Sequence, residues 1–443
     1  MNQREYSFPF FCIPRGLIRI REKKCAAGLI SAILFFILFE RFLVQLGVPG
    51  AVIYIIDVVN VYLMIKILSD RSWRPMWVLV VAYAILVFAS VLTAFPNYFV
   101  WNGNIVTTLL ELRNILRFLI FFLACVTFLK REDIERIFKV LILFFYVNSI
   151  YIIYQYFTFH PENTWMRGDQ LNGFFGTETG GNTFVNVLML VVVAYLMNQW
   201  ANGKIKTICF ILPLLLSVGI AGLIELKAYF LEVAFVYIWY LLRKRKTYRQ
   251  VWMNLILIVA LIIVAYAALQ YMFIEYPWFR ETMSLQGLLS SVTDTGGYTG
   301  EQDLNRFTGI MTISKTIFHG DLAEVLFGIG LGNGSVSGFG GDGTLFSQMY
   351  ADNHYAWFSN TYVFVQCGLL GVGIYIFTFL YLFFKKKYKK EYGLLVEIMA
   401  LLAIFLFFYG EALKTDAGYF VYFALACGFM VSRDKTDELR RVE

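Results

Sequence analysis

The sequence predicts an all-α integral membrane protein whose chain crosses the bilayer many times. Of its 443 residues, 59% are Ala, Val, Ile, Leu, Met, Phe, Trp, Tyr or Cys, whereas soluble domains hold about 45–50% apolar residues even with glycine counted. Apolar runs of about 20 residues, each long enough to cross a bilayer as a helix, recur along almost the whole chain. Because no segment alternates as the strands of a membrane barrel do, the runs are expected to be helices.

The apolar runs predict about twelve transmembrane helices. The expected spans are residues 26–46, 49–68, 76–95, 105–129, 137–159, 183–199, 205–222, 224–242, 251–272, 358–384, 393–410 and 415–432. Lys and Arg gather in every second connection, at residues 15–24, 71–74, 130–139, 204–206, 243–249, 385–390 and 433–441. Because cytoplasmic loops are enriched in Lys and Arg, this side and both termini are predicted to be cytoplasmic.

Residues 1–443 are expected to form a single transmembrane domain with two long outer loops, 160–182 and 273–357. Loops of this length are usually functional or disordered, so function is sought there. In the larger loop, residues 284–300 are rich in Ser, Thr and Gly and are expected to be mobile. Apolar residues at helical spacing predict a helix against the membrane surface in the same loop. These residues are Phe307, Ile310, Met311, Ile317 and Phe318.

Charged residues inside the expected spans predict a polar cavity that opens outward, because a charge in the bilayer is costly and usually functional. These residues are Glu40, Arg41, Asp57, Glu111, Arg113, Arg117, Glu225, Lys227 and Glu232. The alternative interpretation is a set of buried salt bridges that fix helix packing. Arg113 and Arg117 lie four residues apart on one helix face, so they repel unless an anion or carboxylate lies between them.

Basic residues and histidines on the expected outer side are candidates for chemistry on phosphate. Arg167 and Arg306 lie in the outer loops, and the planar guanidinium binds phosphate through paired, charge-assisted hydrogen bonds. An isolated loop arginine is more often simply solvated. His160, His319 and His354 lie on the same side, where one of them could act as a general base near neutral pH.

Several classes of protein are disfavoured. The net charge of +7 comes from clusters at the ends of spans, so it indicates helix orientation and anionic lipid, and not nucleic acid. The Gly-rich stretch 328–343 lacks a nucleotide-binding pattern. The sequence contains no recognisable set of metal ligands, so no metal and no cofactor are expected.

Four local patterns, in order between residues 105 and 384, resemble one family. They are Arg-Gly-Asp-Gln-Leu-Asn-Gly-Phe-Phe-Gly at 167–176, the turn 222–229 around Lys227, Arg306 followed by Gly-Ile-Gly-Leu-Gly-Asn at 328–333, and the segment 352–371 with His354 and Asn360. Together they resemble the O-antigen polymerase and O-antigen ligase superfamily, the Wzy-type membrane glycosyltransferases. The sequence departs from the family at Lys227, where Arg is usual, and at Ser359, where the family often has His and His354 lies five residues earlier.

The resemblance implies a membrane glycosyltransferase architecture of the GT-C type in the cytoplasmic membrane of a bacterium. It implies a metal-independent, inverting polymerase of O-antigen or capsular polysaccharide. Such an enzyme transfers oligosaccharide repeat units from undecaprenyl diphosphate to a growing lipid-linked glycan on the outer face. The implied catalytic residues are Arg167, Lys227, Arg306 and His354, and the implied substrate-binding residues are Arg113, Arg117, Glu225, His319, Asn333 and Asn360.

Two other functions stay open. A ligase of the same superfamily would transfer the glycan to a lipid core or a protein. A transporter of the lipid-linked glycan would also use charged helices, but the large, asymmetric outer loop and the lack of matching halves disfavour it. The expected partners are the lipid-linked donor and acceptor, membrane lipid, a chain-length regulator and a flippase.

Overall fold

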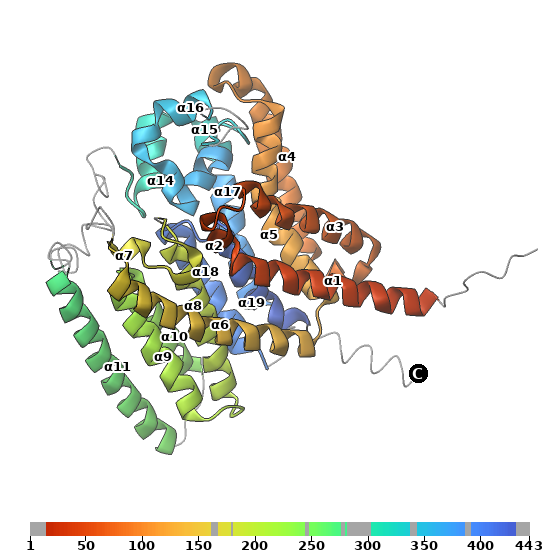
Figure 1. Ribbon diagram of the computed structural model, residues 1–443. Helices are drawn as coiled ribbons and strands as arrows, with labels where there is room; N and C mark the ends of the chain where they lie inside the picture. Colours follow the sequence, from red (N-terminus) through yellow and green to blue (C-terminus); the bar gives the residue numbers. More distant parts are fainter. Residues whose placement is uncertain are drawn as a thin grey trace, which may run out of the picture.

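The computed structural model describes residues 15–160, 167–178, 180–243, 248–275, 280, 303–336, 343–385 and 391–430. Within these ranges the regular structure is entirely helical, which confirms the predicted all-α class (Figure 1). The long helices are α1 (Arg15–Ile37), α3 (Ile55–Ser69), α4 (Trp77–Trp101), α5 (Ile105–Phe128), α6 (Arg131–Thr158), α8 (Asn182–Ala201), α9 (Thr207–Leu223), α10 (Lys227–Arg243), α11 (Tyr248–Glu275), α17 (Ser359–Phe384), α18 (Gly393–Tyr409) and α19 (Gly418–Met430). The short helices and turns are α2 (Glu40–Gln45), η1 (Gly50–Tyr54), η2 (Arg71–Met76), α7 (Arg167–Gln170), η4 (Gly173–Phe175), α14 (Gly309–Thr312), η5 (Ile313–Ile317), α15 (Leu322–Phe327), α16 (Leu345–Met349), η6 (Ala351–Asn353) and η7 (Tyr355–Trp357).

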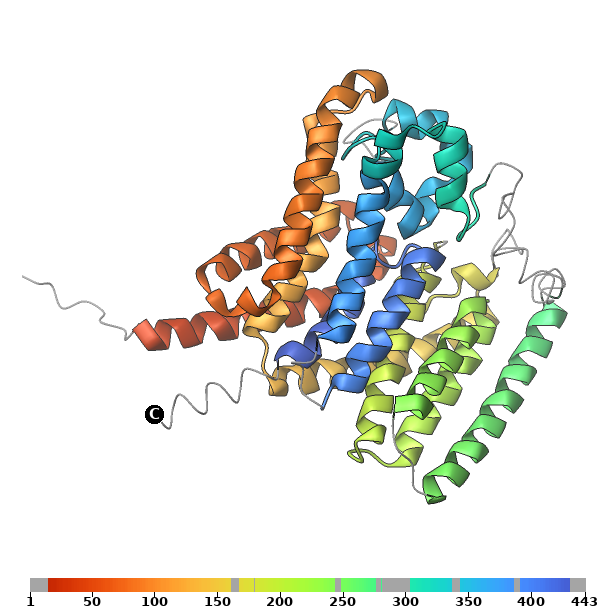
Figure 2. The same cartoon turned by 180° about the vertical axis from the view of Figure 1, so that it is seen from behind.

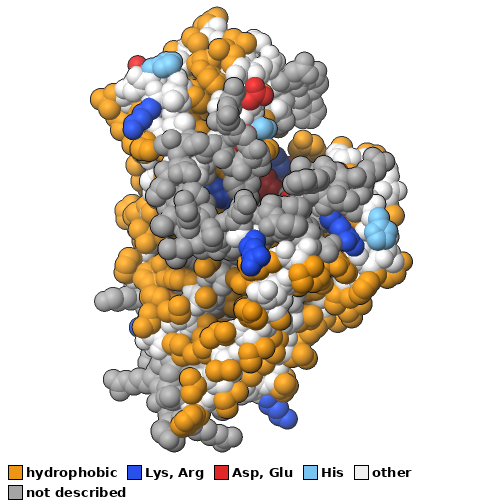
Figure 3. Space-filling view, turned by 90° about the vertical axis from the view of Figure 1, so that its left-hand side faces the viewer, with side chains coloured by type: hydrophobic (Ala, Val, Ile, Leu, Met, Phe, Trp, Pro, Cys, Tyr) orange, Lys and Arg blue, Asp and Glu red, His pale blue; other side chains and the backbone are white. Residues whose placement is uncertain are grey.

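Five helical segments of the described chain are long and apolar enough to cross a membrane. They are Gly50–Ser69, Ser72–Trp101, Arg131–Thr158, Asn182–Ala201 and Ser359–Phe384. Shorter apolar helices at Thr207–Leu223, Ile258–Ile274, Gly393–Tyr409 and Gly418–Phe429 add to them. Figure 3 shows hydrophobic side chains over most of the lower part of one face, as a lipid-facing surface requires. The count of twelve spans stays a prediction.

The first expected span, 26–46, is not one continuous helix. Helix α1 ends at Ile37, and α2 begins at Glu40 after a short break. Glu40 is buried, and Arg41 lies over the Phe184 ring at the start of α8, 4.6 Å from its centroid. The apolar run is interrupted where two charged side chains turn inward.

Helices α5 and α19 pack against each other in the core of the molecule. The Phe118 ring of α5 stacks on Tyr422, with centroids 5.3 Å apart, and meets the edge of Tyr419 at 5.1 Å. All three side chains are buried. Helices α17 and α18 flank this pair, with Tyr375 stacked on Phe407 at 5.1 Å. These aromatic contacts fix the helices on which the polar residues of the site lie.

The connections of the chain meet at two separate ends of the bundle. At one end Lys23 lies 3.2 Å from Asp70, and Arg131 lies 2.9 Å from Glu391. The Lys204 ammonium also pairs with Glu391. We call this the basic end, because it holds the connections that the charge pattern predicts to be cytoplasmic.

The other end, here called the loop end, holds residues 167–182, 224–227, 303–358 and 410–416 where described. Ser359 N donates to Gly410 O at 2.9 Å, and Asn360 Nδ2 donates to Arg306 O at 2.9 Å. Figures 1 and 2 show α14, α15 and α16 gathered at this end beside α17. Which end faces the cytoplasm stays a prediction from the charge pattern.

The Gly-Ile-Gly-Leu-Gly-Asn element threads between α4, α5 and α17. Ile329 N donates to Val365 O at 2.9 Å, and Leu331 N donates to Ser90 O at 3.0 Å. A Cβ atom on Gly330 would lie 2.4 Å from the Ala94 Cα atom, and the φ of Gly330 is +89°. Glycine is therefore required here by both contact and conformation.

The helix predicted in the larger loop is present, but it is partly covered by protein. It forms α14 and the π-helical turn η5. Ile313, Ile317 and Phe318 are buried, and the Phe318 ring lies 5.5 Å from Phe364 of α17. The apolar face was expected on the membrane surface. Of the five predicted residues, Ile317 and Phe318 are buried in the protein instead, whereas Phe307 and Met311 are exposed.

Some predictions concern residues outside the described ranges. They are the stretch 284–300, which was predicted to be mobile, and the basic clusters 244–246, 386–390 and 433–441.

Candidate functional site

The charges of Lys227 and Arg306 act on one half-buried carboxyl group, Asp169, at the loop end. Burial raises the pKa of Asp169 above its usual range, and the positive charges of Lys227 and Arg306 lower it again. The net direction of the shift is upward. Asp169 belongs to α7, Lys227 begins α10, and Arg306 lies just before α14. Three segments that are far apart in sequence thus lie near enough for Lys227 and Arg306 to influence the charge of Asp169.

Local contacts hold each of these groups in place. Asp169 Oδ1 accepts a hydrogen bond of 2.6 Å from Asn182 Nδ2, at the start of α8. The Lys227 ammonium lies 3.7 Å from a Glu225 carboxylate oxygen. Glu225 has a left-handed backbone with φ of +58°, which forms the tight turn between α9 and α10. Glu225, predicted to bind substrate, therefore lies beside Lys227.

Aromatic rings hold the Arg306 guanidinium. Its central carbon lies 3.9 Å from the centroid of the Tyr409 ring and 5.5 Å from that of Phe358. Asn360, predicted to bind substrate, is fully buried and donates to the Arg306 carbonyl. In this structure Asn360 fixes the backbone of Arg306.

Arg167 starts the same short helix as Asp169, but its side chain turns toward α6. Its Nη2 donates to the Tyr156 carbonyl at 2.6 Å, and its guanidinium lies 4.8 Å from the centroid of the Tyr156 ring. The structure therefore brings the segment of Arg167 to the cluster and directs its guanidinium to the end of α6.

The three histidines lie in different surroundings. His354 Nδ1 lies 2.7 Å from Asp303 Oδ1, in the segment that also carries Arg306. His319, predicted to bind substrate, is exposed in the turn before α15. Burial raises the pKa of Glu324, Asp321 raises it further, and His319 lowers it. His160 is an exposed residue just after α6. Of the three, only His354 has a carboxylate hydrogen bond within the described chain.

A polar cavity of about 420 Å³ contains four of the charged residues that predicted one, Glu40, Arg41, Arg113 and Arg117, in its lining. Its charged lining residues are Glu40, Arg41, Arg113, Arg117, Glu178, Lys414 and Asp416. Tyr54, Phe184 and Tyr362 add aromatic surface. A cavity with both donors and acceptors next to aromatic faces suits a ligand rich in hydroxyl groups.

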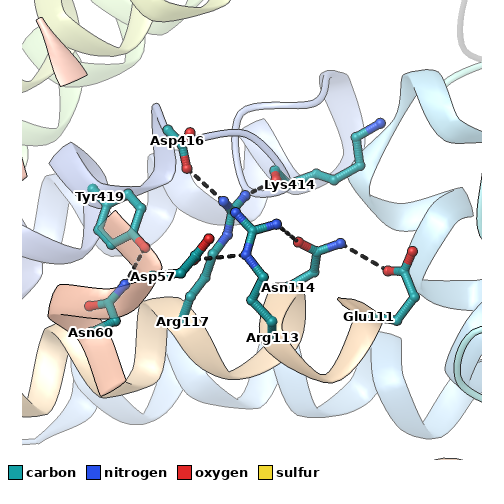
Figure 4. A network of polar contacts seen from close by, with 9 residues as sticks. All are labelled: Asp57, Asn60, Glu111, Arg113, Asn114, Arg117, Lys414, Asp416 and Tyr419. Atoms are coloured by element: carbon teal, nitrogen blue, oxygen red, sulfur yellow. Dashed lines mark hydrogen bonds and ion pairs between the residues drawn. The ribbon is translucent and has the colours of Figure 1, made fainter. Parts of the chain in front are cut away.

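Arg113 and Arg117 each form an ion pair with a different carboxylate (Figure 4). Arg113 Nε lies 2.7 Å from Asp57 Oδ1, and Arg117 Nη1 lies 2.6 Å from Asp416 Oδ1. The carboxylates required by the spacing of the two arginines are therefore supplied by α3 and by the loop after α18. They neutralise both charges, so the arginines present N–H groups to the cavity with little net charge.

Lys414 connects the cavity with the loop end. Its ammonium donates to the Ala356 carbonyl and lies 5.1 Å from the centroid of the Tyr362 ring. Burial lowers the pKa of Lys414, and the charge of Glu411 counteracts this shift. Residues 414–416 thus line the cavity, and Lys414 also holds the Ala356 carbonyl, two residues after His354.

Asn333, the last predicted substrate-binding residue, is fully buried in the glycine element. Its Nδ2 donates to Ile329 O at 2.8 Å and to Ala94 O at 3.1 Å. In these contacts it holds the element against α4.

Sequence reasoning missed Asp169, Asp303, Asp416 and Lys414. Asp169 and Asp303 each lie within three residues of a predicted arginine, which was the only local signal. No group of three or more His, Cys, Asp and Glu side chains in the described part of the chain could hold a metal ion.

The fold and the site define an all-helical protein with helices suited to a membrane, and with Lys227 and Arg306 near Asp169 at the loop end. No protein-family model, no curated protein and no solved structure matches the chain.

Proposed function

We propose that the chain is a polymerase of O-antigen or capsular polysaccharide. In this proposal it transfers oligosaccharide repeat units from undecaprenyl diphosphate to the acceptor hydroxyl of another lipid-linked glycan. The resemblance of four sequence patterns supports the assignment, and so does the position of these patterns in the structure. Segments 167–176, 222–229 and 303–306 contribute to one cluster at the loop end.

The observation that carries the proposal is that Lys227 and Arg306 lie near enough to Asp169 for both of their charges to lower its pKa. Lys227 and Arg306 lie near two carboxylates, Asp169 and Glu225, which hold the cations in place. A diphosphate leaving group gains negative charge in the transition state, and fixed cations stabilise that charge. Arg306 supplies a planar fork for phosphate oxygens, whereas Lys227 supplies a compact charge.

The acceptor needs a base, and His354 is the candidate. The acceptor oxygen attacks the anomeric carbon as the bond from that carbon to the diphosphate oxygen breaks. His354 takes the hydroxyl proton, and the diphosphate leaves with the electron pair. Attack opposite the leaving group inverts the anomeric configuration.

Two cavities fit the two parts of such a substrate. The polar cavity of about 420 Å³ offers donors, acceptors and aromatic faces to sugars. A second, apolar groove of about 610 Å³ runs along α1, α2 and the start of α3. Helix α2 separates them, with Glu40, Arg41 and Val44 facing the polar cavity and Phe39, Phe42 and Leu43 lining the groove. The groove suits the polyprenyl chain.

The proposal includes about twelve spans in the cytoplasmic membrane of a bacterium, cytoplasmic termini and a site on the outer face. A flippase would deliver the substrate to that face, and a chain-length regulator would act on the product.

Extension of lipid-linked glycans by the purified protein tests the function. The protein in detergent is given undecaprenyl-diphosphate-linked repeat units alone, and products are separated by size and identified by mass. Longer lipid-linked chains are expected, because one repeat unit can serve as donor and another as acceptor.

Other products would identify the other functions. A ligase would leave the repeat units unextended until a lipid core or protein acceptor is added. A transporter would leave them chemically unchanged and move them across a bilayer. Either result overturns the polymerase assignment.

A further inference from the structure

We propose that Asp303 is a positioning residue that fixes the tautomer of His354, so that its Nε2 atom accepts the proton. The role of His354 in glycan transfer rests on the proposed function. The effect of Asp303 on the His354 tautomer does not.

The carboxylate and the imidazole differ in their access to solvent. The distance between His354 Nδ1 and Asp303 Oδ1 is 2.7 Å, and the Asp303 side chain is only 5% exposed, compared with 39% for His354. The ring therefore turns its Nδ1 edge toward a buried carboxylate, while the side chain as a whole stays partly exposed. A general base needs one nitrogen held by the protein and the other reachable by substrate.

Contacts around His354 fix the orientation of its ring. His354 has a left-handed backbone with φ of +49°, which is uncommon for a residue with a side chain. Leu304 N donates to Asn353 O at 3.1 Å, which ties the Asp303 segment to the residue before His354. The Trp357 ring stacks on the imidazole, with centroids 3.8 Å apart and planes at 20°. The unusual backbone is thus held by contacts on both sides.

The hydrogen bond determines which nitrogen carries the proton. An ionised carboxylate only accepts hydrogen bonds, so the neutral imidazole beside it places its proton on Nδ1. The lone pair then lies on Nε2. In transfer, the acceptor hydroxyl gives its proton to Nε2 as its oxygen bonds to the anomeric carbon. The bond from that carbon to the diphosphate breaks, and the imidazolium later releases the proton to water.

The same segment also carries Arg306, three residues after Asp303. The Leu304 backbone N–H donates a hydrogen bond to the carbonyl of the residue before His354. The Arg306 carbonyl accepts a hydrogen bond from the Asn360 side chain. One short segment therefore places both the base and a cation for the leaving group.

Nitrogen NMR of histidine tests the tautomer directly. The chain has only three histidines, so labelling with ¹⁵N-histidine gives few signals, and His354→Gln identifies those of His354. At a pH where His354 is neutral, the wild type should show a protonated Nδ1 and an unprotonated Nε2. Asp303→Asn should shift the population toward a protonated Nε2. Asp352→Asn, an exposed carboxylate two residues before His354, is the matched control and should change nothing.

Kinetics provide the second measurement. Asp303→Asn is expected to lower kcat by about 10²-fold, within the usual contribution of a general base, with little change in the KM of the donor. Asp303→Asn should also move the acidic limb of the pH profile of kcat. Asp303→Glu should restore part of the rate. A structural role alone would alter stability without moving that limb.

The two proposals can fail separately. A protonated Nε2 in wild-type His354 overturns the positioning role even if the Asp303 variants do not fold. An Nδ1 proton that stays in place in a folded Asp303→Asn protein overturns it as well. If the tautomer depends on Asp303 but no glycan is extended, the positioning role stands and the proposed function fails.

Discussion

Asn360 Nδ2 donates a hydrogen bond of 2.9 Å to the backbone carbonyl of Arg306. The bond links the first turn of α17 to the segment before α14, and it fixes the backbone from which the Arg306 guanidinium reaches the Tyr409 ring. A side chain predicted to touch substrate thus acts through its neighbour in this structure. This relationship allows the direct role of Arg306 to be separated from its placement.

Arg306→Ala should lower the rate of glycan extension by about 10–100-fold, because it removes a charge-assisted hydrogen bond to the diphosphate worth about 1.5–3 kcal/mol. Arg306→Lys should restore part of the rate, since the charge remains and the fork is lost. Initial rates are measured at equal amounts of folded protein. Asn360→Ala should lower the rate less than Arg306→Ala. Wild-type rates in Arg306→Ala would remove this residue from the site.

The Arg117–Asp416 pair should be important for stability. The side chains are 5% and 11% exposed, and removing one partner of a buried pair costs about 3–5 kcal/mol, because the other charge is left uncompensated. Arg117→Met should therefore lower the melting temperature strongly in detergent, and Asp416→Asn in the same chain should recover part of the loss. The more exposed Arg113–Asp57 pair is the control and should cost less when broken. Equal losses for both pairs would contradict the burial argument.

Gly330→Ala should prevent correct packing of the glycine element. The added methyl would lie 2.4 Å from the Ala94 Cα atom, on a backbone whose φ of +89° suits glycine. Gly373→Ala in α17 is the matched control, because nothing lies within 4 Å of its Cβ position, and alanine favours a helix by about 0.5–1 kcal/mol over glycine. Gly330→Ala should lower the melting temperature and broaden the size-exclusion peak. Gly373→Ala should keep the wild-type peak and raise the melting temperature slightly.

These contacts show what the sequence could and could not predict. Apolar runs predict the helices well, because each run must be helical in lipid whatever its neighbours are. The four-residue spacing of Arg113 and Arg117 predicted carboxylate partners but could not identify them, since Asp416 lies 299 residues from Arg117. Asp303 was missed for the same reason, because it meets His354 across 51 residues with no local pattern. The break after Ile37 was missed, because the charges of Glu40 and Arg41 predict a polar cavity but not an interruption of the helix.

Asp169 should make stability depend on pH in a defined direction. Burial raises its pKa in the folded state above the ordinary value of 3.8, so above that pH the folded state holds the proton more strongly than the unfolded state. Stability therefore falls as pH rises from about 3.8 through the folded pKa, and stays lower above it. Asp169→Asn removes this term, and the melting temperatures of wild type and variant should converge toward low pH. A difference that does not vary with pH would exclude Asp169 as the titrating group.

The orientation of the two ends decides where any chemistry takes place. The connections at the basic end are rich in Lys and Arg, so this end is predicted to face the cytoplasm. Single cysteines in a cysteine-free background test it with a reagent that does not cross membranes. Thr316→Cys and Asp352→Cys, both exposed at the loop end, should react in intact cells from which the outer barrier has been removed. Glu132→Cys and Gly203→Cys, both exposed at the basic end, should react only after permeabilisation.

The opposite labelling pattern would place the cluster of Asp169, Lys227 and Arg306 in the cytoplasm. Nucleotide sugars would then be available to the site, and the argument for a lipid-linked donor would lose its basis. Labelling of all four cysteines before permeabilisation would indicate leaky cells, so a known cytoplasmic protein is labelled in parallel. The expected pattern requires the loop end to lie outside, where lipid diphosphate is the activated form of the sugar that the proposed transfer uses.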